Sequence, residues 1–464
     1  MTPENKRIPC TKRIAGELEQ KIRDGILRTG TKLPSVRELA ETYHTCTSVC
    51  LSVYRALEKK QLVQREPGRG TFVCRSLPPE VKEYVTSWNG IYPHAKMSAF
   101  LDRVFADNGL EHWRQNPFYT DQYSESIDYL EFSGKAMSHP GTLAMDEGLL
   151  PVFADRDLLY PLDDFLDRSR VLRRTDFPEK LLKTFSYRGK LYALPFLFSP
   201  VMLIYHKRLF RECGMPEPLA DWTWEELYRN TELLTRSSDD GKHILQYGLG
   251  ILFTFNSYIP FIIQNGGELF DANGNCVLSS RNAFEALHFF SELFALPGVC
   301  SHKFGDPRSA LADLMANDLM AMMIGDAVDY QYLTRKLPPD QVGILPLPAR
   351  RLRSTSLSAH GWAIHRNCRN PEAHFRFLEH LYTSPGLGEL CRHPDFPFPA
   401  FHPEDNGVPE PFLEALEYAR PALTSPSPTA VKMLCETVST LLGHKMILTP
   451  EKAKSFETKI NISL

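Results

Sequence analysis

The alternation of apolar and polar residues near the start of the chain predicts three short helices. The first covers residues 11–28, where a single apolar stripe is formed by Ile14, Leu18, Ile22 and Ile26. Ser35 and Glu38 stand at capping-box spacing, so Ser35 should cap a second helix that begins there. A third helix, which Thr45 could cap, follows from the apolar positions Val49, Val53, Tyr54 and Leu57. Two short helices joined by a tight turn form a helix-turn-helix.

A hairpin is predicted directly after these helices. Residues 62–65 and 71–74 have the composition of strands, and the glycine-rich segment 66–70 lies between them. Such a hairpin is a wing, which lies along the DNA backbone or minor groove while the third helix enters the major groove. The residues predicted to form the DNA-binding surface are Ser35, Arg37, Thr47, Ser48, Arg69 and Gly70. The alternative is a solvated helix arginine for Arg37 and ordinary surface polarity for Thr47 and Ser48.

Charge is distributed unevenly over the 464 residues. The whole chain has a formal net charge of -3, but residues 1–76 hold 15 Lys and Arg against 8 Asp and Glu, a net charge of +7. The remaining residues hold 38 against 48, a net charge of -10. A small basic head on a large acidic body indicates that only the head meets the phosphates of a nucleic acid.

Residues 8–74 resemble the winged-helix head of GntR-type regulators, in which LPS-x-R-x-LA precedes a recognition helix and then G-R-G-T-F-V. Leu33–Ala40 and Gly68–Val73 match these two motifs closely. The recognition helix departs from the family, because Cys46–Cys50 stands where Ser-Arg-x-Thr-Val is usual and Gln61 replaces a glycine before the wing. The lost arginine puts inherited base preferences in doubt, although not the mode of docking.

The ten cysteines show no CxxC pair and no regular spacing, so reduced thiols in a cytosol are expected. Cys46 and Cys50 lack the paired spacing of zinc ligands and are interpreted as small buried hydrophobic residues. The sequence shows no apolar leader and no run of about 18 uncharged apolar residues, so we expect neither a signal peptide nor a membrane span. No metal or cofactor site is predicted.

The larger part of the chain has the alternating helices and strands of an α/β protein. A short, stiff linker at residues 76–80 follows the head, whose predicted domain is 1–75. Early strands are predicted at residues 81–85 and 127–132, with helices and strands alternating afterwards. A capping box is predicted from Thr223 to Glu226 at the start of an amphipathic helix, so Trp222 and Trp224 are interpreted as structural.

Several segments of this body, taken in order, resemble family 1 extracellular solute-binding proteins of sugar-uptake ABC transporters. They are Gly189–Phe196, Val201–Phe210, Gln264–Asp271, Met320–Asp326, His360–Ile364 and Thr449–Ala453. The resemblance implies a periplasmic-binding-protein-like (type II) fold over residues 81–464, with two α/β lobes and a ligand cleft between them. One lobe would contain about 81–194 and 360–397, the other about 195–359 and 398–464, with strand crossings near 194–196, Trp362 and Phe398.

A sugar cleft needs aromatic faces for C–H groups and polar side chains for hydroxyl groups. The residues that the resemblance brings to the cleft are Trp88, Asn89, Asp146, Glu147, Phe198, Asp326, His360 and Trp362. The alternatives are packing in a lobe core for the aromatic residues and simple loop exposure for the polar ones. Relatives that bind maltose-like chains carry a tryptophan soon after the glycine matching Gly325, whereas Asp326–Asp329 follows here. A more acidic cleft would favour a polar monosaccharide, an amino sugar or a cationic ligand.

Head and body together predict a non-enzymatic cytoplasmic regulator that binds operator DNA and a sugar-like effector, as a homodimer away from the membrane. One rival is a regulator with an aminotransferase-like domain that binds pyridoxal phosphate, but no setting for its lysine and acidic partner is visible. GxSxG, HExxH and GxxxxGK[ST] motifs are also missing from the sequence. A solute-binding protein without a regulatory role, or a body that only mediates dimer contacts, remain as alternatives.

Overall fold

The computed structural model divides the chain into two compact units, Met1–Glu83 and Tyr84–Leu464. The residues that the structure describes are 10–23, 26–27, 30–60, 62–66, 69–73, 83–86, 94–110, 112–116, 136–271, 273–303, 309–393, 396–421 and 428–462. Among them, no helix has both the length and the apolar character that crossing a membrane requires.

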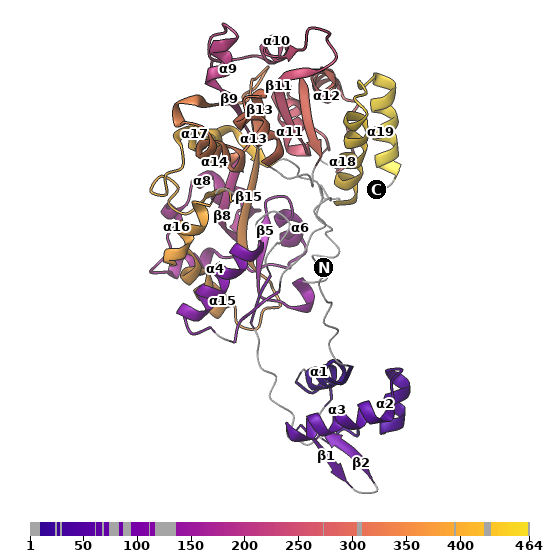
Figure 1. The fold of residues 1–464 in the computed structure, drawn as a ribbon. Helices are drawn as coiled ribbons and strands as arrows, with labels where there is room; N and C mark the ends of the chain where they lie inside the picture. Colours follow the sequence, from indigo (N-terminus) through magenta and orange to yellow (C-terminus); the bar gives the residue numbers. More distant parts are fainter. Residues whose placement is uncertain are drawn as a thin grey trace. The chain divides into compact units, whose positions relative to one another are not determined.

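The first unit contains the head, a three-helix module followed by a two-stranded hairpin (Figure 1). Its elements are α1 (Cys10–Arg23), α2 (Val36–Thr42), α3 (Thr47–Lys59), β1 (Val63–Glu66) and β2 (Gly70–Val73). Ile14, Leu18 and Ile22 form the apolar stripe of α1 and are buried in the core of the head. The Tyr54 hydroxyl on α3 donates to the carbonyl of Pro34, which ties α3 to the start of α2. The predicted winged helix-turn-helix is confirmed.

Two details of the head differ from the sequence prediction. The first helix ends at Arg23, because the Leu27 N–H donates to the Lys21 carbonyl at 3.0 Å and folds the chain back. Ile26 is therefore 68% exposed and does not extend the apolar stripe. The third helix is capped at Cys46 rather than Thr45, and the Cys46 side chain forms no capping hydrogen bond.

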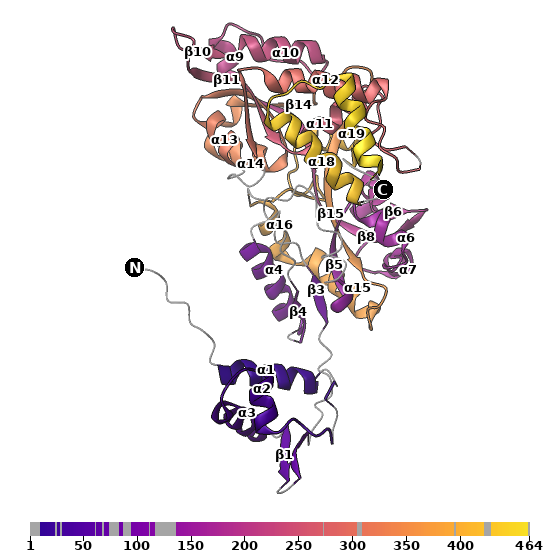
Figure 2. The ribbon, with the colours of Figure 1, turned by 90° about the vertical axis from the view of Figure 1, so that its right-hand side faces the viewer.

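The second unit contains the body, in which two cores define two α/β lobes (Figures 1 and 2). The sheet of the first lobe has the strand order β16-β8-β15-β5-β3-β4, with β17 also paired to β15. Its strands are β3 (Tyr84–Thr86), β4 (Arg114–Gln115), β5 (Thr142–Asp146), β8 (Ala193–Pro200), β15 (Thr355–Ile364), β16 (Phe398–Pro399) and β17 (Ala419–Pro421). Its helical segments are α4 (His94–Asp107), α6 (Leu150–Asp155), α7 (Asp163–Arg168), η1 (Arg174–Asp176), α8 (Glu179–Thr184), α15 (Pro371–Thr383), α16 (Pro385–Cys391) and α17 (Glu410–Tyr418). A small hairpin is formed by β6 (Ser186–Tyr187) and β7 (Lys190–Leu191).

The second lobe is built on a sheet with the strand order β10-β11-β13-β9-β14, and β12 also pairs with β11. Its strands are β9 (Met202–His206), β10 (Arg236–Ser237), β11 (Ile244–Phe253), β12 (Val299–Lys303), β13 (Met320–Gly325) and β14 (Val342–Leu345). Its helical segments are α9 (Lys207–Glu212), α10 (Trp224–Leu233), α11 (Phe255–Gln264), α12 (Arg281–Ala295), α13 (Ser309–Ala316), α14 (Ala327–Lys336), η2 (Pro339–Gln341), α18 (Pro428–Gly443) and α19 (Pro450–Ile462). The last two helices pack side by side, with α18 against α12 (Figure 2).

The chain passes between the lobes where β8 of the first lobe is followed directly by β9 of the second. It returns through the segment that enters β15, and the two passages are hydrogen-bonded to each other. The Val201 N–H donates to the Ser356 carbonyl at 3.0 Å, and the Thr355 hydroxyl donates to the Val201 carbonyl at 2.5 Å. These bonds make residues 200–202 and 354–356 the junction of the two lobes.

The lobe boundary near the C-terminus differs from the predicted one. Residues after 398 were expected in the second lobe, but Phe398 and Phe412 lie in the core of the first lobe, with ring centroids 4.7 Å apart. The reason is strand pairing, because Phe398 in β16 lies opposite Phe198 in β8. The chain instead leaves the first lobe between β17 and α18. Residues 127–132, predicted as a strand, lie outside the described residues.

Candidate functional site

The start of α2 shows what Ser35 does in the head. Its hydroxyl accepts from the Glu38 N–H at 3.2 Å, and the Glu38 carboxylate accepts from the Ser35 N–H at 2.7 Å. The Ser35 backbone N–H, and after it the Ser35 side chain, lower the pKa of the Glu38 carboxyl group. Ser35 is thus a helix cap, and Arg37 is exposed in the first turn of the helix that it caps.

Replacing Ser35 with alanine should lower the stability of α2 by about 1 kcal/mol, the usual cost of losing a helix cap. Hydrogen exchange of the α2 backbone amides, measured by mass spectrometry on the full chain, checks this prediction. Ser52→Ala is the matched control, because the exposed Ser52 hydroxyl only donates to the Ser48 carbonyl within α3. Equal exchange rates in the two variants would contradict the capping role.

The N-terminus of α3 exposes Thr47 and Ser48, as the sequence predicts for a recognition helix. Cys46 is exposed as well, and its sulfur lies 3.1 Å from the Ser48 hydroxyl. That hydrogen bond and the Val49 N–H lower the pKa of the Cys46 thiol. Only Cys50, which is buried in the head core, is the small hydrophobic residue that both cysteines were expected to be.

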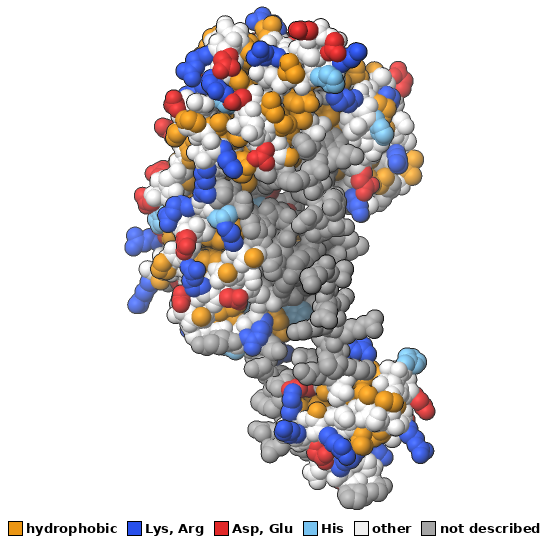
Figure 3. Space-filling model, viewed as in Figure 1, with side chains coloured by type: hydrophobic (Ala, Val, Ile, Leu, Met, Phe, Trp, Pro, Cys, Tyr) orange, Lys and Arg blue, Asp and Glu red, His pale blue; other side chains and the backbone are white. Residues whose placement is uncertain are grey.

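The wing presents Arg69 at its tip. Its guanidinium lies 2.6 Å from the Glu66 carboxylate and 5.7 Å from the centre of the Phe72 ring, with most of the side chain exposed. Gly70 has a φ of +127°, and a Cβ there would come within 2.9 Å of the Lys32 side chain. Gly70 therefore shapes the wing through its backbone. Lys and Arg side chains are visible around the head in Figure 3.

In the body, three of the predicted polar residues, Asp146, Glu147 and His360, meet where β5 ends beside β15. His360 lies opposite Asp146 in the antiparallel ladder. Asp146 Oδ1 accepts from the Leu149 N–H at 2.7 Å, in the turn before α6. Glu147 binds Ala359 twice: its N–H donates to the Ala359 carbonyl at 3.2 Å, and its Oε2 accepts from the Ala359 N–H at 2.9 Å. The Glu147 carboxylate thus accepts from the Ala359 N–H, as a backbone carbonyl of β5 would do within the ladder.

The two neighbouring carboxylates are partly withdrawn from water. Burial raises the pKa of Asp146, although backbone N–H groups of Leu149 and Gly148 oppose this. Burial also raises the pKa of Glu147, and the charge of Asp146 raises it further. Protonation of these groups is therefore easier in the folded protein than in the unfolded chain.

Glu147→Gln should make the protein more stable at pH 8, because the amide oxygen can still accept from Ala359 without a buried charge. An acid whose pKa is raised by folding stabilises the protein most below its ordinary pKa, about 4.5 for glutamate, and less as the pH rises through the raised value. We expect a gain on the order of 1 kcal/mol, or about 2 °C in Tm, at pH 8 and none at pH 4.5. Thermal unfolding at both values, with the exposed Glu436→Gln as control, tests this. A variant less stable than the parent at pH 8 would contradict the burial argument.

Asp326 lies at the N-terminus of α14 in the second lobe. Its Oδ1 accepts from the Val328 N–H at 2.9 Å, and its own N–H donates to Asp329 at 3.0 Å. These two aspartates therefore form a helix capping box, which is how the acidic sequence after Gly325 is used here. The next residue, Ala327, donates its N–H to the Ser199 hydroxyl of β8 at 3.0 Å, so α14 begins against the first lobe.

The two predicted aromatic residues that the structure describes are in the core of the first lobe. Phe198 is fully buried and packs 6.3 Å from Phe398, and Trp362 is 2% exposed and packs 5.7 Å from Phe196. Among the residues that the structure describes, Trp362 Nε1 has no hydrogen-bond partner. Trp88 and Asn89 lie outside the described residues.

On β15 the sequence analysis named His360 and Trp362 but missed Ser356 and Ser358, which belong to the same row. Because alternate residues of a strand face the same side, Ser356, Ser358, His360 and Trp362 share one face of the sheet. Ser358 lies opposite Ser199 and His360 opposite Asp146, which adds two polar residues to that face. The period-two pattern S-x-S-x-H-x-W was visible in the sequence and could have revealed this polar row.

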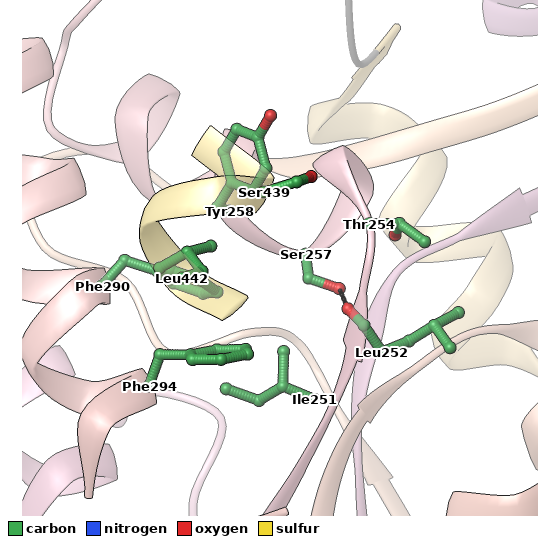
Figure 4. Close-up of a pocket in the computed structure, with 9 residues that line it drawn as sticks. All are labelled: Ile251, Leu252, Thr254, Ser257, Tyr258, Phe290, Phe294, Ser439 and Leu442. Atoms are coloured by element: carbon green, nitrogen blue, oxygen red, sulfur yellow. Dashed lines mark hydrogen bonds between the residues drawn. The ribbon is translucent and has the colours of Figure 1, made fainter. Parts of the chain in front are cut away.

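A small pocket lies elsewhere in the second lobe, among β11, α11, α12 and α18. Its lining residues are Ile251, Leu252, Thr254, Ser257, Tyr258, Phe290, Phe294, Ser439 and Leu442 (Figure 4). The Ser257 hydroxyl donates to the Leu252 carbonyl at 2.6 Å, and the interior is too small for a water molecule. This pocket is a packing gap rather than a site for a sugar-sized ligand.

Two family models match the chain. The model described as bacterial extracellular solute-binding protein matches residues 139–386, which is more than half of the chain. The model described as bacterial regulatory proteins, gntR family, matches residues 10–73. Neither is a family of enzymes.

Curated relatives match one part of the chain or the other. A Brucella abortus protein named as a candidate binding protein is 24% identical over 254 residues, which are 53% of this chain and 58% of that protein. The uncharacterized HTH-type transcriptional regulator YdeF of Bacillus subtilis is 43% identical over 65 residues, which are 14% of each chain. The chain therefore spans little more than half of the first relative and a small part of the second.

Solved structures share the fold of the body. The maltose-bound MalE3 of T. maritima has a TM-score of 0.65 at 17% identity, covering 82% of this chain and 100% of that one. An ABC substrate-binding protein of Listeria monocytogenes in complex with cycloalternan has a TM-score of 0.64 at 17% identity, covering 82% and 98%. A solute-binding protein of Agrobacterium vitis with bound D-mannitol also has a TM-score of 0.64 at 17% identity, with the same coverage. The chain belongs to the bacterial extracellular solute-binding protein family and carries an N-terminal winged helix-turn-helix domain of the gntR family of bacterial regulatory proteins.

Proposed function

We propose that this protein is a transcriptional regulator whose affinity for operator DNA is controlled by a small carbohydrate ligand bound between the two lobes of its body. The observation that carries the proposal is the joining of a gntR-type winged helix and a solute-binding body in one chain. A transported solute needs no DNA-binding head, whereas a ligand-controlled regulator needs both parts. The protein would act in the cytoplasm, where its operator lies.

The head would bind one operator half-site. In this arrangement α3 enters the major groove with Thr47 and Ser48 at its leading end, while Arg37 and the wing residue Arg69 meet base edges or phosphates. Ser35 and Gly70 support this surface through their cap and backbone. A homodimer would match the two-fold symmetry of most operators.

The body would hold its ligand at the junction of the lobes. The first lobe offers the polar row of β15 with Asp146, and the second lobe offers the start of α14 at Asp326. The three solved structures described above carry cycloalternan, maltose and D-mannitol, all of which are rich in hydroxyl groups. Polar side chains of the kind found here pair with such groups.

Ligand binding would change the angle between the lobes. The passages at residues 200–202 and 354–356 are short and hydrogen-bonded, which suits a hinge. A coupling free energy of about 1–3 kcal/mol, typical of allosteric proteins, would change operator affinity about 5-fold to 150-fold. The sign of the change decides between repressor and activator.

The proposal is tested in two steps with the full chain. A thermal-shift screen against monosaccharides, oligosaccharides, amino sugars and sugar alcohols should find at least one compound that raises Tm in a concentration-dependent way. That compound should then alter binding to DNA from the region upstream of the protein's own gene by at least 5-fold. DNA binding that no ligand changes would contradict ligand control. Ligand binding without any DNA binding would favour a solute-binding protein with no regulatory role.

A further inference from the structure

We propose that the ligand of the body is an aminated sugar or polyol, whose ammonium group lies against Asp146 and Glu147 and whose hydroxyl groups pair with the polar row of β15. This inference rests on the proposed function, because it specifies the ligand class of the same site. It is carried by two independent observations, one on charge and one on hydrogen bonding.

The first observation is a pair of adjacent carboxylates without a counter-charge. Asp146 and Glu147 are half-buried at the end of β5, and each uses one oxygen to accept from a backbone N–H. In the part of the chain that the structure describes, no lysine or arginine forms an ion pair with either residue. Two neighbouring negative charges withdrawn from water are costly unless a cation or a proton neutralises them.

The second observation is a set of buried polar atoms on the neighbouring strand. Trp362 is 2% exposed, yet its Nε1 has no partner within the described ranges. The buried Ser356 Oγ has none there either, but it lies six residues along the strand, about 20 Å away, beyond the reach of one monosaccharide. Between them on the same face lie Ser358, half-buried, and His360, which is directly opposite Asp146. An unsatisfied buried polar atom costs about 1–3 kcal/mol, so such atoms are normally paired with a bound molecule or water.

The two observations together select one class of ligand. A metal ion would neutralise the carboxylates, but it offers no acceptor to the indole N–H of Trp362. A neutral sugar offers donors and acceptors, but with such a ligand the two carboxylates can be neutralised only by taking up protons. A polyol that carries an ammonium group meets both requirements, since hydroxyl oxygens accept from Nε1 and the ammonium group donates to carboxylate oxygens.

The remaining acidic residues near the junction do not change this assignment. Asp326 and Asp329 are engaged with backbone N–H groups in the α14 capping box. The two aspartates that follow Gly325 therefore stabilise the N-terminus of α14. The positive end of α14 also offsets the charge of this capping box, so the carboxylates without such compensation are Asp146 and Glu147 of the first lobe.

The test compares matched sugars that differ only in the group on carbon 2, which is a hydroxyl, an amine or an acetamide. Isothermal titration calorimetry of the full chain should include glucosamine, glucose and N-acetylglucosamine, together with the corresponding galactose series. The amine of one series should bind at least ten-fold more tightly than its neutral counterparts. Neutral compounds that bind as tightly as the amine would overturn the inference and leave the sugar-sensor proposal standing. Binding of none of these compounds, together with no hit in the wider carbohydrate screen, would contradict both.

Two sets of variants locate the site. Asp146→Asn and Glu147→Gln, singly and together, keep acceptors for the Leu149 and Ala359 N–H groups, and they should reduce the preference for the amine to less than two-fold. Trp362→Phe keeps the ring but removes the N–H, so it should weaken every member of the preferred series by about 5-fold. The exposed Glu436→Gln is the charge control and should change nothing. A preference for the amine that survives in the Asp146→Asn, Glu147→Gln double variant, folded as judged by thermal unfolding, would overturn the assignment.

Discussion

Replacing Gln264 with leucine should lower the free energy of unfolding of the body by about 2–6 kcal/mol. Gln264 is fully buried at the end of α11. Its Nε2 donates to the Ser354 carbonyl at 2.7 Å, and its Oε1 accepts from the Trp224 indole N–H at 2.7 Å. Leucine is similar in size, so the main effect is to leave one donor and one acceptor buried without partners, at about 1–3 kcal/mol each.

Chemical denaturation of the full chain, followed by tryptophan fluorescence, measures this loss. Gln331→Leu is the matched control, because Gln331 is only half-buried and donates a single hydrogen bond, to the Phe396 carbonyl at 2.7 Å. The control should cost less than about 1.5 kcal/mol, since water can reach the acceptor that it leaves. A Gln264 variant no less stable than this control would show that its buried bonds contribute little.

The Gln264→Leu substitution should also affect the hinge between the two lobes. Ser354 stands at the entry to β15, and its hydroxyl donates to the Tyr418 carbonyl of the first lobe at 3.3 Å. Thr355 next to it bonds to Val201 in the opposite passage. Gln264 on α11 therefore links the second lobe to the start of β15, the strand through which the chain returns to the first lobe. Its loss should also broaden the range of lobe angles.

Features set by a few neighbouring residues were predictable from the sequence. The capping boxes Ser35–Glu38 and Thr223–Glu226 form as predicted, because the partners lie one helical turn apart and the pattern itself determines the contact. The apolar stripe of α1 was also readable up to Ile22. It ends there because a hydrogen bond across the end of the helix reverses the chain, which periodicity does not encode.

Features set by long-range pairing could not be read in the same way. Whether Phe198 and Trp362 face a cleft or a core depends on what packs on each face of β8 and β15, and both rings are buried. Phe398 joins the first lobe because it pairs with β8, some 200 positions earlier in the chain. The role of Asp326 as a cap was within reach, since Asp329 follows it at capping-box spacing.

Replacing Arg37 with alanine should weaken binding to the operator by about 5-fold to 150-fold, or about 1–3 kcal/mol. Arg37 is exposed in the first turn of α2, and the Ser35 cap fixes the direction of that turn. The usual arginine of the recognition helix is replaced by Thr47, so fewer cations are left to meet DNA from the helices, and each should contribute more. The helix itself should be unaffected, since alanine is the better helix former.

Fluorescence anisotropy with DNA from upstream of the protein's own gene, at several salt concentrations, separates the two possible contacts of Arg37. If it meets a phosphate, Arg37→Ala weakens binding to all sequences alike and reduces the salt slope by about 1. If it meets a base, the loss is concentrated on the operator and specificity falls at one position. Lys432→Ala, on the exposed surface of α18, is the charge-matched control and should leave affinity unchanged. Unaltered operator binding by Arg37→Ala would mean that α2 does not approach the DNA, and the docking mode proposed for the head would then be wrong.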